Sequence, residues 1–444
     1  MTDRDTATRP RRKAGRNAFM FVIVMVTIDM MGFGMIAPVM PELIEDLTDL
    51  PPSEGVVWGG LLTAVYAFMN FLAMPTLGNL SDRFGRRPIM LGSTAMLAVD
   101  FLIMALAGNI WLLFLGRTLA GISSATFSTA NAYIADTTDP ETRVRAFGMI
   151  GAAFGIGFVV GPALGGALGE LHPRAPFFAA AGLAGLNFLY GLLVLPESLA
   201  REDRRPFELK RANPLGAVKH FRRIPQVSWF LVAIGLFMLA HSVYPTTWNF
   251  HGEIRYGWTS AEIGLSLALV GTGAAVVQAL LMGPIVNRLG PTRTAMVGLF
   301  VNVLALTLYS MAGLGWMAYA IIPISALGGI AQPAINTMMS NVTPRNAQGE
   351  LHGASASLNA AAITIAPLIM TQTLHHFSKA DAPVHFPGAA FLLAAILTAL
   401  AFIPFLAGVR ANRGDIDAID EGETPISASD NTATDALAGK ATPE

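Results

Sequence analysis

Three ionisable side chains interrupt long apolar stretches of this 444-residue chain: Asp29, Asp100 and Arg117. A charge at the centre of a bilayer costs at least about 2.5 to 3.5 kcal/mol, so it is rarely kept without a task. Burial and a neighbouring cation shift the pKa of a carboxyl group in opposite directions, so a carboxyl whose surroundings alternate can load and release a proton. We expect Asp29 or Asp100 to carry a proton while Arg117 holds the other carboxylate ionised. A buried structural ion pair is the alternative.

The elements that position these residues must be membrane helices. Hydrophobic residues make up 53% of the chain, charged residues make up 13%, and the mean hydropathy is +0.52. Such a composition excludes a soluble globular protein. The net charge of -1 gives no reason to expect a nucleic-acid partner. The absence of cysteine excludes disulfides and cysteine-based metal or redox chemistry.

Twelve apolar segments are long enough to cross the roughly 30 Å hydrocarbon core as helices. They lie at residues 18–40, 57–78, 88–108, 110–133, 146–169, 176–195, 227–248, 261–282, 294–313, 316–340, 350–374 and 388–409. The sequence therefore predicts an all-α integral membrane protein with twelve transmembrane helices. Residues 1–17 form a basic tail. Residues 411–444 are rich in Asp, Thr, Ala and Ser without periodicity, so we expect them to be disordered.

Basic residues indicate the orientation of these helices. An even number of spans places both termini on one side, and 25 of the 29 Lys and Arg residues lie in the tails and loops of that side. The opposite loops hold only Arg174, Arg255 and Lys379. Because loops rich in Lys and Arg stay in the cytoplasm, we expect a multi-pass inner-membrane protein with both termini cytoplasmic.

A charged linker at residues 196–225 divides the chain into two six-helix halves, 18–195 and 226–410. Within the linker, Asn213-Pro214 begins a short helix that we expect either on the lipid surface or in solvent. The halves repeat at an offset of 205 residues, as in Gly78/Gly283, Arg83/Arg288, Gly85/Gly290, Asn131/Asn336, Thr138/Thr343, Gly148/Gly353 and Pro162/Pro367. Such a parallel repeat predicts pseudo-symmetry about an axis along the membrane normal, with the substrate site between the halves.

The loop between spans 2 and 3, GNLSDRFGRRP at residues 78–88, contains the strongest local motif. One acid, Asp82, lies among Arg83, Arg86 and Arg87, with glycines at Gly78 and Gly85. A basic turn that only fixed topology would need neither the acid nor the glycines. An acid beside arginines and a helix N-terminus makes a charge latch that can hold one conformation. The second half has Asn287 at the place of Asp82, so only the first latch is complete.

Small residues dominate the fifth predicted span, GMIGAAFGIGFVVGPALGG at residues 148–166. Its marked positions are Gly148, Gly157, Gly161, Pro162 and Gly166. In a bilayer, small residues allow a neighbouring helix to pack closely, and proline adds a bend. We expect Gly157 and Gly161 to face a neighbouring span across a contact that moves. Helix packing without a further role is the alternative.

Polar residues inside the spans of the second half are neutral. Candidates for a substrate cavity are Gln278, Asn302, Gln332 and Asn336, and His241 is either a packing residue or a cavity donor. The loops show no His or carboxylate cluster with metal-ligand spacing and no pairing of a nucleophile with a base. We therefore expect no metal site and no enzymatic activity.

From Asp29 to about Pro404 the chain resembles the tetracycline-efflux branch of the drug:proton antiporters in the major facilitator superfamily. The resemblance is carried by residues 29–41, the loop 78–88, Arg117 with Gly121, and the run 148–166; YIADTTDPETR and GWTSAEIG add to it. It implies that Asp29 and Asp100 serve proton coupling and substrate binding, with Arg117 relaying charge. It further implies gating by Asp82, Arg86 and Arg87, and a cavity lined by Asn70 and Gln278.

The chain departs from that branch at three places. Those exporters carry a histidine in span 8 and an acid in span 9, where this chain has Ala274 and the Asn302-Val303 neighbourhood, and a span 2 glutamine is Asn70 here. We therefore expect proton-coupled efflux of a small amphipathic compound by the same machinery, and these departures weigh against tetracycline itself as the substrate. Proton symport of an organic metabolite and a non-transporting sensor are the alternatives. The partners we expect are substrate, protons and lipids, for a monomer that uses the proton gradient and no cofactor.

Overall fold

The computed structural model describes residues 16–124, 126–208, 227–344 and 347–421. Within these ranges, eleven helical stretches are long and apolar enough to cross a membrane, and one of them, Ser260–Met311, is 52 residues long. That stretch turns at Gly290, whose φ of 73° is not helical, so it crosses twice. The predicted all-α membrane fold with twelve spans is confirmed.

The first half contains eight helices within the described residues. They are α1 (Arg16–Ile36), α2 (Met40–Thr48), α3 (Pro52–Phe84), α4 (Arg86–Ala105), α5 (Ile110–Ser123), α6 (Thr126–Thr137), α7 (Pro140–Gly169) and α8 (Ala175–Val194). The second half consists of α9 (Ser228–His241), α10 (Val243–Tyr256), α11 (Ser260–Val276), a π-helical turn (Val277–Leu281), α12 (Met282–Met311), α13 (Gly315–Gly328), α14 (Ala331–Val342), α15 (Gln348–Ser378) and α16 (Ala389–Ala411). The short helix α17 (Arg413–Glu421) follows.

Several spans predicted as single helices are broken in the middle. Span 4 consists of α5 and α6, span 7 of α9 and α10, and span 10 of α13 and α14. The cap residues that end α5 and α13 are Ser124 and Gly329, which are 205 residues apart and so obey the repeat. Breaks at matching positions of two repeats are where transporters of this construction place their substrate sites.

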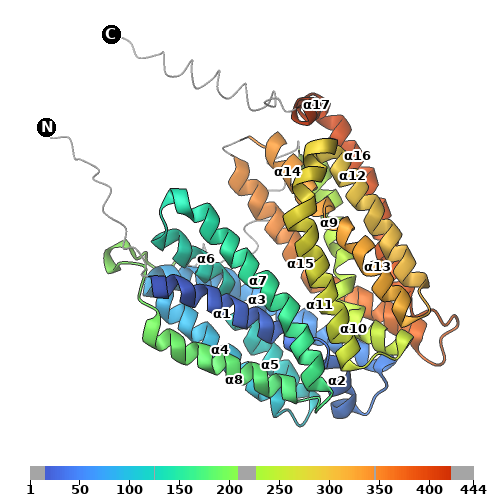
Figure 1. The fold of residues 1–444 in the computed structure, drawn as a ribbon, viewed down its shortest axis with the longest axis horizontal. Coiled ribbons are helices and arrows are strands. Elements are labelled where there is room, and N and C mark those ends of the chain that lie inside the picture. Colours follow the sequence, from blue (N-terminus) through green and yellow to red (C-terminus); the bar gives the residue numbers. More distant parts are fainter. Residues whose placement is uncertain (1–15, 125, 209–226, 345–346, 422–444) are drawn as a thin grey trace.

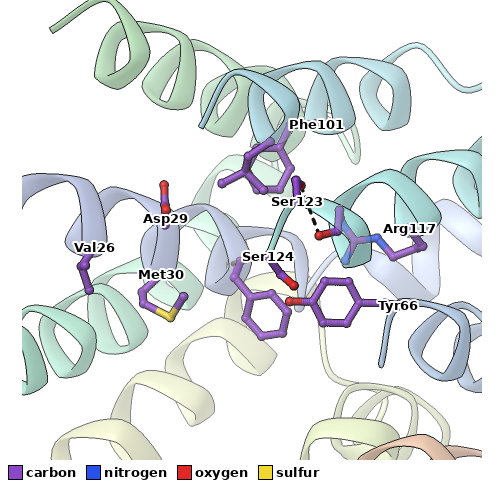
Figure 2. A pocket seen from close by; sticks show the side chains of 11 residues that line it. Val26, Asp29, Met30, Tyr66, Phe101, Arg117, Ser123 and Ser124 are labelled. Atoms are coloured by element: carbon purple, nitrogen blue, oxygen red, sulfur yellow. Dashed lines mark hydrogen bonds between the residues drawn. The ribbon is translucent and has the colours of Figure 1, made fainter. Parts of the chain in front are cut away.

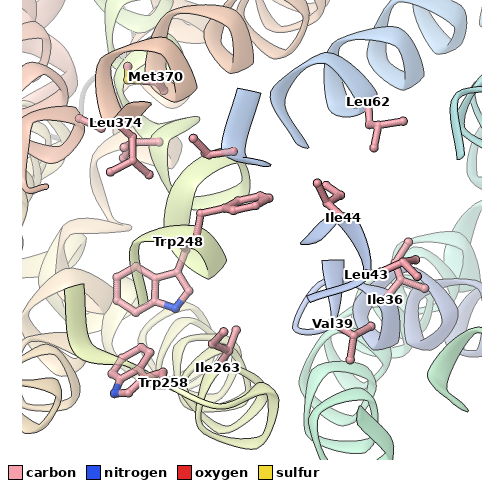
Figure 3. Close-up of a cluster of buried hydrophobic side chains, with 14 of the residues drawn as sticks. Ile36, Val39, Leu43, Ile44, Leu62, Trp248, Trp258, Ile263, Met370 and Leu374 are labelled. Atoms are coloured by element: carbon pink, nitrogen blue, oxygen red, sulfur yellow. The ribbon is translucent and has the colours of Figure 1, made fainter. Parts of the chain in front are cut away.

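Among the described residues, one buried apolar cluster contains side chains of both halves. It includes residues of the end where α2 and α10 lie together in Figure 1. There, Ile36, Val39 and Leu43 of the first half belong to the same buried cluster as Trp248 and Met370 of the second (Figure 3). Two further clusters each lie within a single half, one from Phe21 to Leu195 and one from Val227 to Ile416. We call the joined end, around α2 and α10, the closed face. The end where α1 begins and α16 ends is the terminal face.

Hydrogen bonds between the halves reinforce the closed face. The side-chain amide of Asn249 donates to the carbonyl oxygen of Ala37 at 2.6 Å, and His375 Nδ1 lies 2.8 Å from the carbonyl oxygen of Ser53. Toward the terminal face, Figure 1 shows the halves diverging, with α6 and α14 apart. The structure is therefore a conformation closed at one face.

Two sequence-based expectations about the polar segments have different outcomes. Residues 411–444 were expected to be disordered, but residues 413–421 form α17, because Ile416 is buried against the core of the second half. That part of the expectation is wrong. The predicted helix at Asn213-Pro214 lies outside the described residues.

Candidate functional site

A pocket in the first half is lined by two of the three predicted ionisable residues, Asp29 and Arg117 (Figure 2). Its lining comes from α1, α3, α4 and α5, and includes Ser124 at the break of span 4: Val26, Asp29, Met30, Phe33, Tyr66, Leu97, Phe101, Arg117, Ala120, Ser123 and Ser124. The lining is mainly apolar with a few polar groups, as is usual for sites that bind small organic molecules.

Asp100 and Arg117 form an ion pair beside this pocket. Arg117 Nη2 donates to Asp100 Oδ2 at 3.3 Å. Arg117 is 7% exposed and Asp100 is 0% exposed. Gly116 makes room for the carboxylate, since a Cβ at this position would lie 2.7 Å from Asp100 Oδ1. Asp29, which is also buried, lines the same pocket. The structure thus brings together all three residues that we singled out for proton coupling.

The loop of residues 78–88 forms an ion-pair network at the terminal face. Arg86 Nη1 lies 2.6 Å from Asp82 Oδ1, and Arg86 Nε lies 3.1 Å from Asp136 Oδ2 on α6. One arginine therefore bridges two acids from different helices. Asp82 and Arg86 thus form the ion pair that the predicted latch requires, and its role in gating stays a prediction. Asp136 was not among the predicted residues.

The start of the linker is bound to the same loop. The Arg86 backbone N–H donates to Glu197 Oε1 at 2.8 Å, and the Arg205 N–H donates to the carbonyl oxygen of Asp82 at 3.1 Å. Gly85 turns the chain directly from α3 into α4 with a φ of 108°, a region that side chains avoid, and it packs against the Glu197 carboxylate. The start of the linker therefore restrains the latch through hydrogen bonds to the first half.

Within the described ranges, three other residues of the loop make different contacts. Gly78 lies inside α3 with no neighbour within 4 Å of a hypothetical Cβ, so it is not a turn glycine as we had expected. The Arg83 guanidinium lies over the Phe84 ring at 5.1 Å. Arg87 donates to the carbonyl oxygen of Leu192 at 2.9 Å.

The marked residues of span 5 lie on α7 and contact two different helices. A Cβ on Gly157 or Gly161 would lie 2.6 Å from a carbonyl oxygen of α1, so the predicted close approach to a neighbouring span is confirmed. Pro162 packs against Gly34 of α1. Gly166 reaches across to the second half, where a Cβ would lie 2.5 Å from the Ser260 carbonyl oxygen. Gly148 has no neighbour within 4 Å and takes no part in this packing.

The polar candidates of the second half do not line the pocket. Asn302 is fully buried, and its amide donates to the carbonyl oxygens of Gly298 and Gly328 at 3.0 and 2.6 Å. It therefore stabilises the break of span 10, and we withdraw its assignment to substrate binding. Gln278 lies in the π-helical turn and donates to the Gly329 carbonyl oxygen at 3.4 Å. Gln332 is half-buried and Asn336 is exposed. Asn70 of the first half, which was also predicted for the cavity, is half-buried and is not among the lining residues.

Sequence reasoning missed Tyr66, Asp136 and Glu197. Tyr66 gave no signal because an aromatic residue in an apolar span is ordinary. Asp136 and Glu197 follow the apolar runs of spans 4 and 6 directly, and acids placed at span ends on a basic side could have been paired with the loop arginines. Among the described residues, no group of three or more His, Asp or Glu side chains could hold a metal ion.

Comparisons with known proteins agree with this architecture. The model of the family described as Major Facilitator Superfamily matches residues 22–367 and 255–438. The chain is 40% identical over 356 residues to the tetracycline resistance protein, class C, of Escherichia coli, covering 80% of this chain and 89% of that protein. It is 34% identical over 385 residues to the class B protein of Escherichia coli, covering 86% and 94%.

Solved structures share the fold at low sequence identity. A bacterial homolog of the human lysosomal transporter Spinster, in an inward-facing and unoccupied conformation, has a TM-score of 0.71 at 16% identity, covering 89% of this chain and 96% of that chain. The human organic anion transporter MFSD10 has a TM-score of 0.63 at 22% identity, covering 88% and 99%. These likenesses concern the fold alone.

Proposed function

The chain belongs to the Major Facilitator Superfamily, and on that premise we propose that it exports a small amphipathic, drug-like compound in exchange for protons. The relatives named as tetracycline resistance proteins support efflux, and they make tetracyclines the first compounds to test. The family supports transport rather than catalysis. We further propose that the protein acts as a monomer without a cofactor.

The observation that carries the coupling is the buried pair of Asp100 and Arg117 beside a pocket that also contains Asp29. A proton that neutralises one of the carboxylates changes the charge balance around Arg117 and therefore the cost of exposing the pocket to either face. One proton crossing about 100 mV supplies about 2.3 kcal/mol. At about 1.4 kcal/mol per tenfold, this sustains roughly a fiftyfold substrate gradient.

The proposed orientation places both termini in the cytoplasm of a cell with an inner membrane. The basic residues of the terminal side support this orientation. The conformation described above is then the one that opens to the cytoplasm, from which an exporter loads its substrate.

A growth-inhibition panel in an efflux-deficient host identifies the substrate, and everted membrane vesicles then test the exchange. We expect each protective compound to cause release of protons from energised vesicles. In the double variant Asp29→Asn, Asp100→Asn this release should disappear, while downhill exchange of the compound persists. Proton release that persists in the double variant would refute the assignment of the two carboxylates. Proton and compound moving in the same direction would refute antiport.

A further inference from the structure

We propose that Tyr66 is a positioning residue that holds Arg117 in place when Asp100 becomes neutral, an inference that rests on the proton coupling proposed above. The guanidinium carbon of Arg117 lies 5.7 Å from the centre of the Tyr66 ring, over its face. Within about 6 Å, a guanidinium is attracted by the negative face of an aromatic ring. Figure 2 shows both side chains at the same pocket, from α3 and α5.

Close packing of α5 on α3 fixes this geometry. A Cβ on Gly121 would lie 2.5 Å from the carbonyl oxygen of Tyr66 and 2.7 Å from Met69 Cβ, so the two helices touch here through their backbones. Residues four apart lie on the same face of a helix, which places Arg117 one turn from this contact. Gly121 therefore sets the height of Arg117 over the Tyr66 ring.

Asp100 alone does not satisfy the guanidinium of Arg117. A single hydrogen bond of 3.3 Å joins the two side chains, and within the described part of the chain Arg117 Nε finds no hydrogen-bond partner. A buried cation that loses its counter-ion is strongly disfavoured. When Asp100 takes up a proton, the Tyr66 ring is a contact that does not depend on that carboxylate and still attracts the cation.

Tyr66 is itself held by neighbours from other helices. Its ring lies 6.1 Å from the ring of Phe33, which is one turn after Asp29 on α1. Its hydroxyl group faces Ser124 and Asn70.

Asp100 lies on α4, so other ionisable groups near it must come from the helices packed against α4. These groups are Glu54, Tyr66, Asp82 and Arg83 on α3, Arg117 on α5, Tyr133 and Asp136 on α6, and Tyr190 on α8. Of these, Tyr66 and Arg117 line the pocket, together with Asp29 of α1.

Thermal unfolding of the purified chain in detergent tests the proposal without any substrate. Tyr66→Leu should lower Tm in the Asp100→Asn background by at least about 2 °C more than in the wild type. Tyr66→Phe keeps the ring and should show no such difference. Phe33→Leu removes a ring of the same pocket and should lower Tm equally in both backgrounds. Equal effects of Tyr66→Leu in both backgrounds would overturn the proposal, whereas a double variant that alone fails to fold would support it.

Transport measurements provide the second readout. With a compound found in the growth panel, Tyr66→Leu should slow proton-driven uptake into everted vesicles at least tenfold relative to exchange without a proton gradient, and Tyr66→Phe should restore it. A parallel loss of both rates would show that Tyr66 has only a structural role. If no compound is transported, the proposed function fails, yet the unfolding experiment still decides the role of Tyr66.

Discussion

The backbone N–H of Ala261 donates to Glu170 Oε1 at 3.1 Å, and this bond joins the two halves of the protein. Glu170 directly follows α7, and Ala261 lies in the first turn of α11. A second acid of the first half, Glu42, accepts from Ser260 Oγ at 3.2 Å. The first half therefore places carboxylates at the N-terminus of α11, where the helix dipole favours negative charge.

Removing this contact should loosen the closed face. Thr371 is buried against Gly60, where the two halves meet at the closed face. Because the sequence has no cysteine, Thr371→Cys introduces a single thiol, and its reaction with a membrane-impermeant maleimide reports opening of this face. Because an exposed polar contact contributes less than about 1 kcal/mol, Glu170→Ala should increase the rate at which the cysteine at position 371 is labelled by up to about fivefold. Asp381→Ala, an exposed acid on the same side, serves as the control. Unchanged labelling in Glu170→Ala would show that the bond does not hold this face.

The closed face should depend on pH in two opposite ways. Hydrogen bonds from Thr259 and Ala261 lower the pKa of Glu170 below its usual 4.5, so its ionised form stabilises closure and this contribution is lost as the pH falls through the lowered pKa. Burial raises the pKa of Glu42 above 4.5, so acidification first favours closure as Glu42 takes up a proton.

Labelling of Thr371→Cys should therefore pass through a minimum between the raised pKa of Glu42 and the lowered pKa of Glu170. The rates are corrected with an Asp381→Cys reporter for the reactivity of the thiol itself. Burial also raises the pKa of Glu253 on α10 to about 7, so Glu42→Gln should reduce the fall in labelling on the alkaline side of the minimum without removing it. Glu170→Gln should remove the rise on the acid side. A flat profile in the otherwise wild-type chain would contradict both assignments.

Leucine at Gly157 should damage the protein, whereas leucine at Gly148 should not. A Cβ on Gly157 would meet Thr27 and Met30 of α1, while Gly148 has no neighbour within 4 Å. Overpacking of this kind costs about 1–3 kcal/mol, so Gly157→Leu should lower Tm and abolish efflux. Both variants carry the same change in the same helix. Equal Tm values and efflux rates for the two would show that the glycine pattern is incidental.

Asp82→Asn should abolish transport and leave Tm within a few degrees of the wild type. The substitution removes the 2.6 Å ion pair with Arg86, while the apolar packing of α3 and α4 is untouched. Asp136→Asn removes the other acid of the same arginine and should slow transport as well. Asp417→Asn, an exposed partner of Arg413 on α17, controls for loss of an ion pair as such. Wild-type efflux in Asp82→Asn would reduce the loop to a topological turn.

Apolar length, basic residues and internal repetition predicted the twelve spans because a bilayer penalises unpaired backbone and charge so strongly. The same penalty made Asp100 and Arg117 conspicuous. The prediction for Asn302 was wrong, because a side-chain amide in a span can bond either to a ligand or to backbone carbonyl groups at a helix break. The structure shows that Asn302 bonds to the carbonyl oxygens of Gly298 and Gly328. The contact of Tyr66 with Arg117 could not be predicted, because the packing of α5 on α3 at Gly121 that fixes it is a property of neither segment alone.

Gly290 repeats the backbone of Gly85, with φ values of 73° and 108° and the same ψ of 163°, although its own loop has Asn287 in place of the acid. The two halves thus share the geometry of this turn, whereas only the first has the acid. Any restraint that depends on this acid therefore acts from the first half alone, so the repeat is symmetrical in its backbone and asymmetrical in its charge.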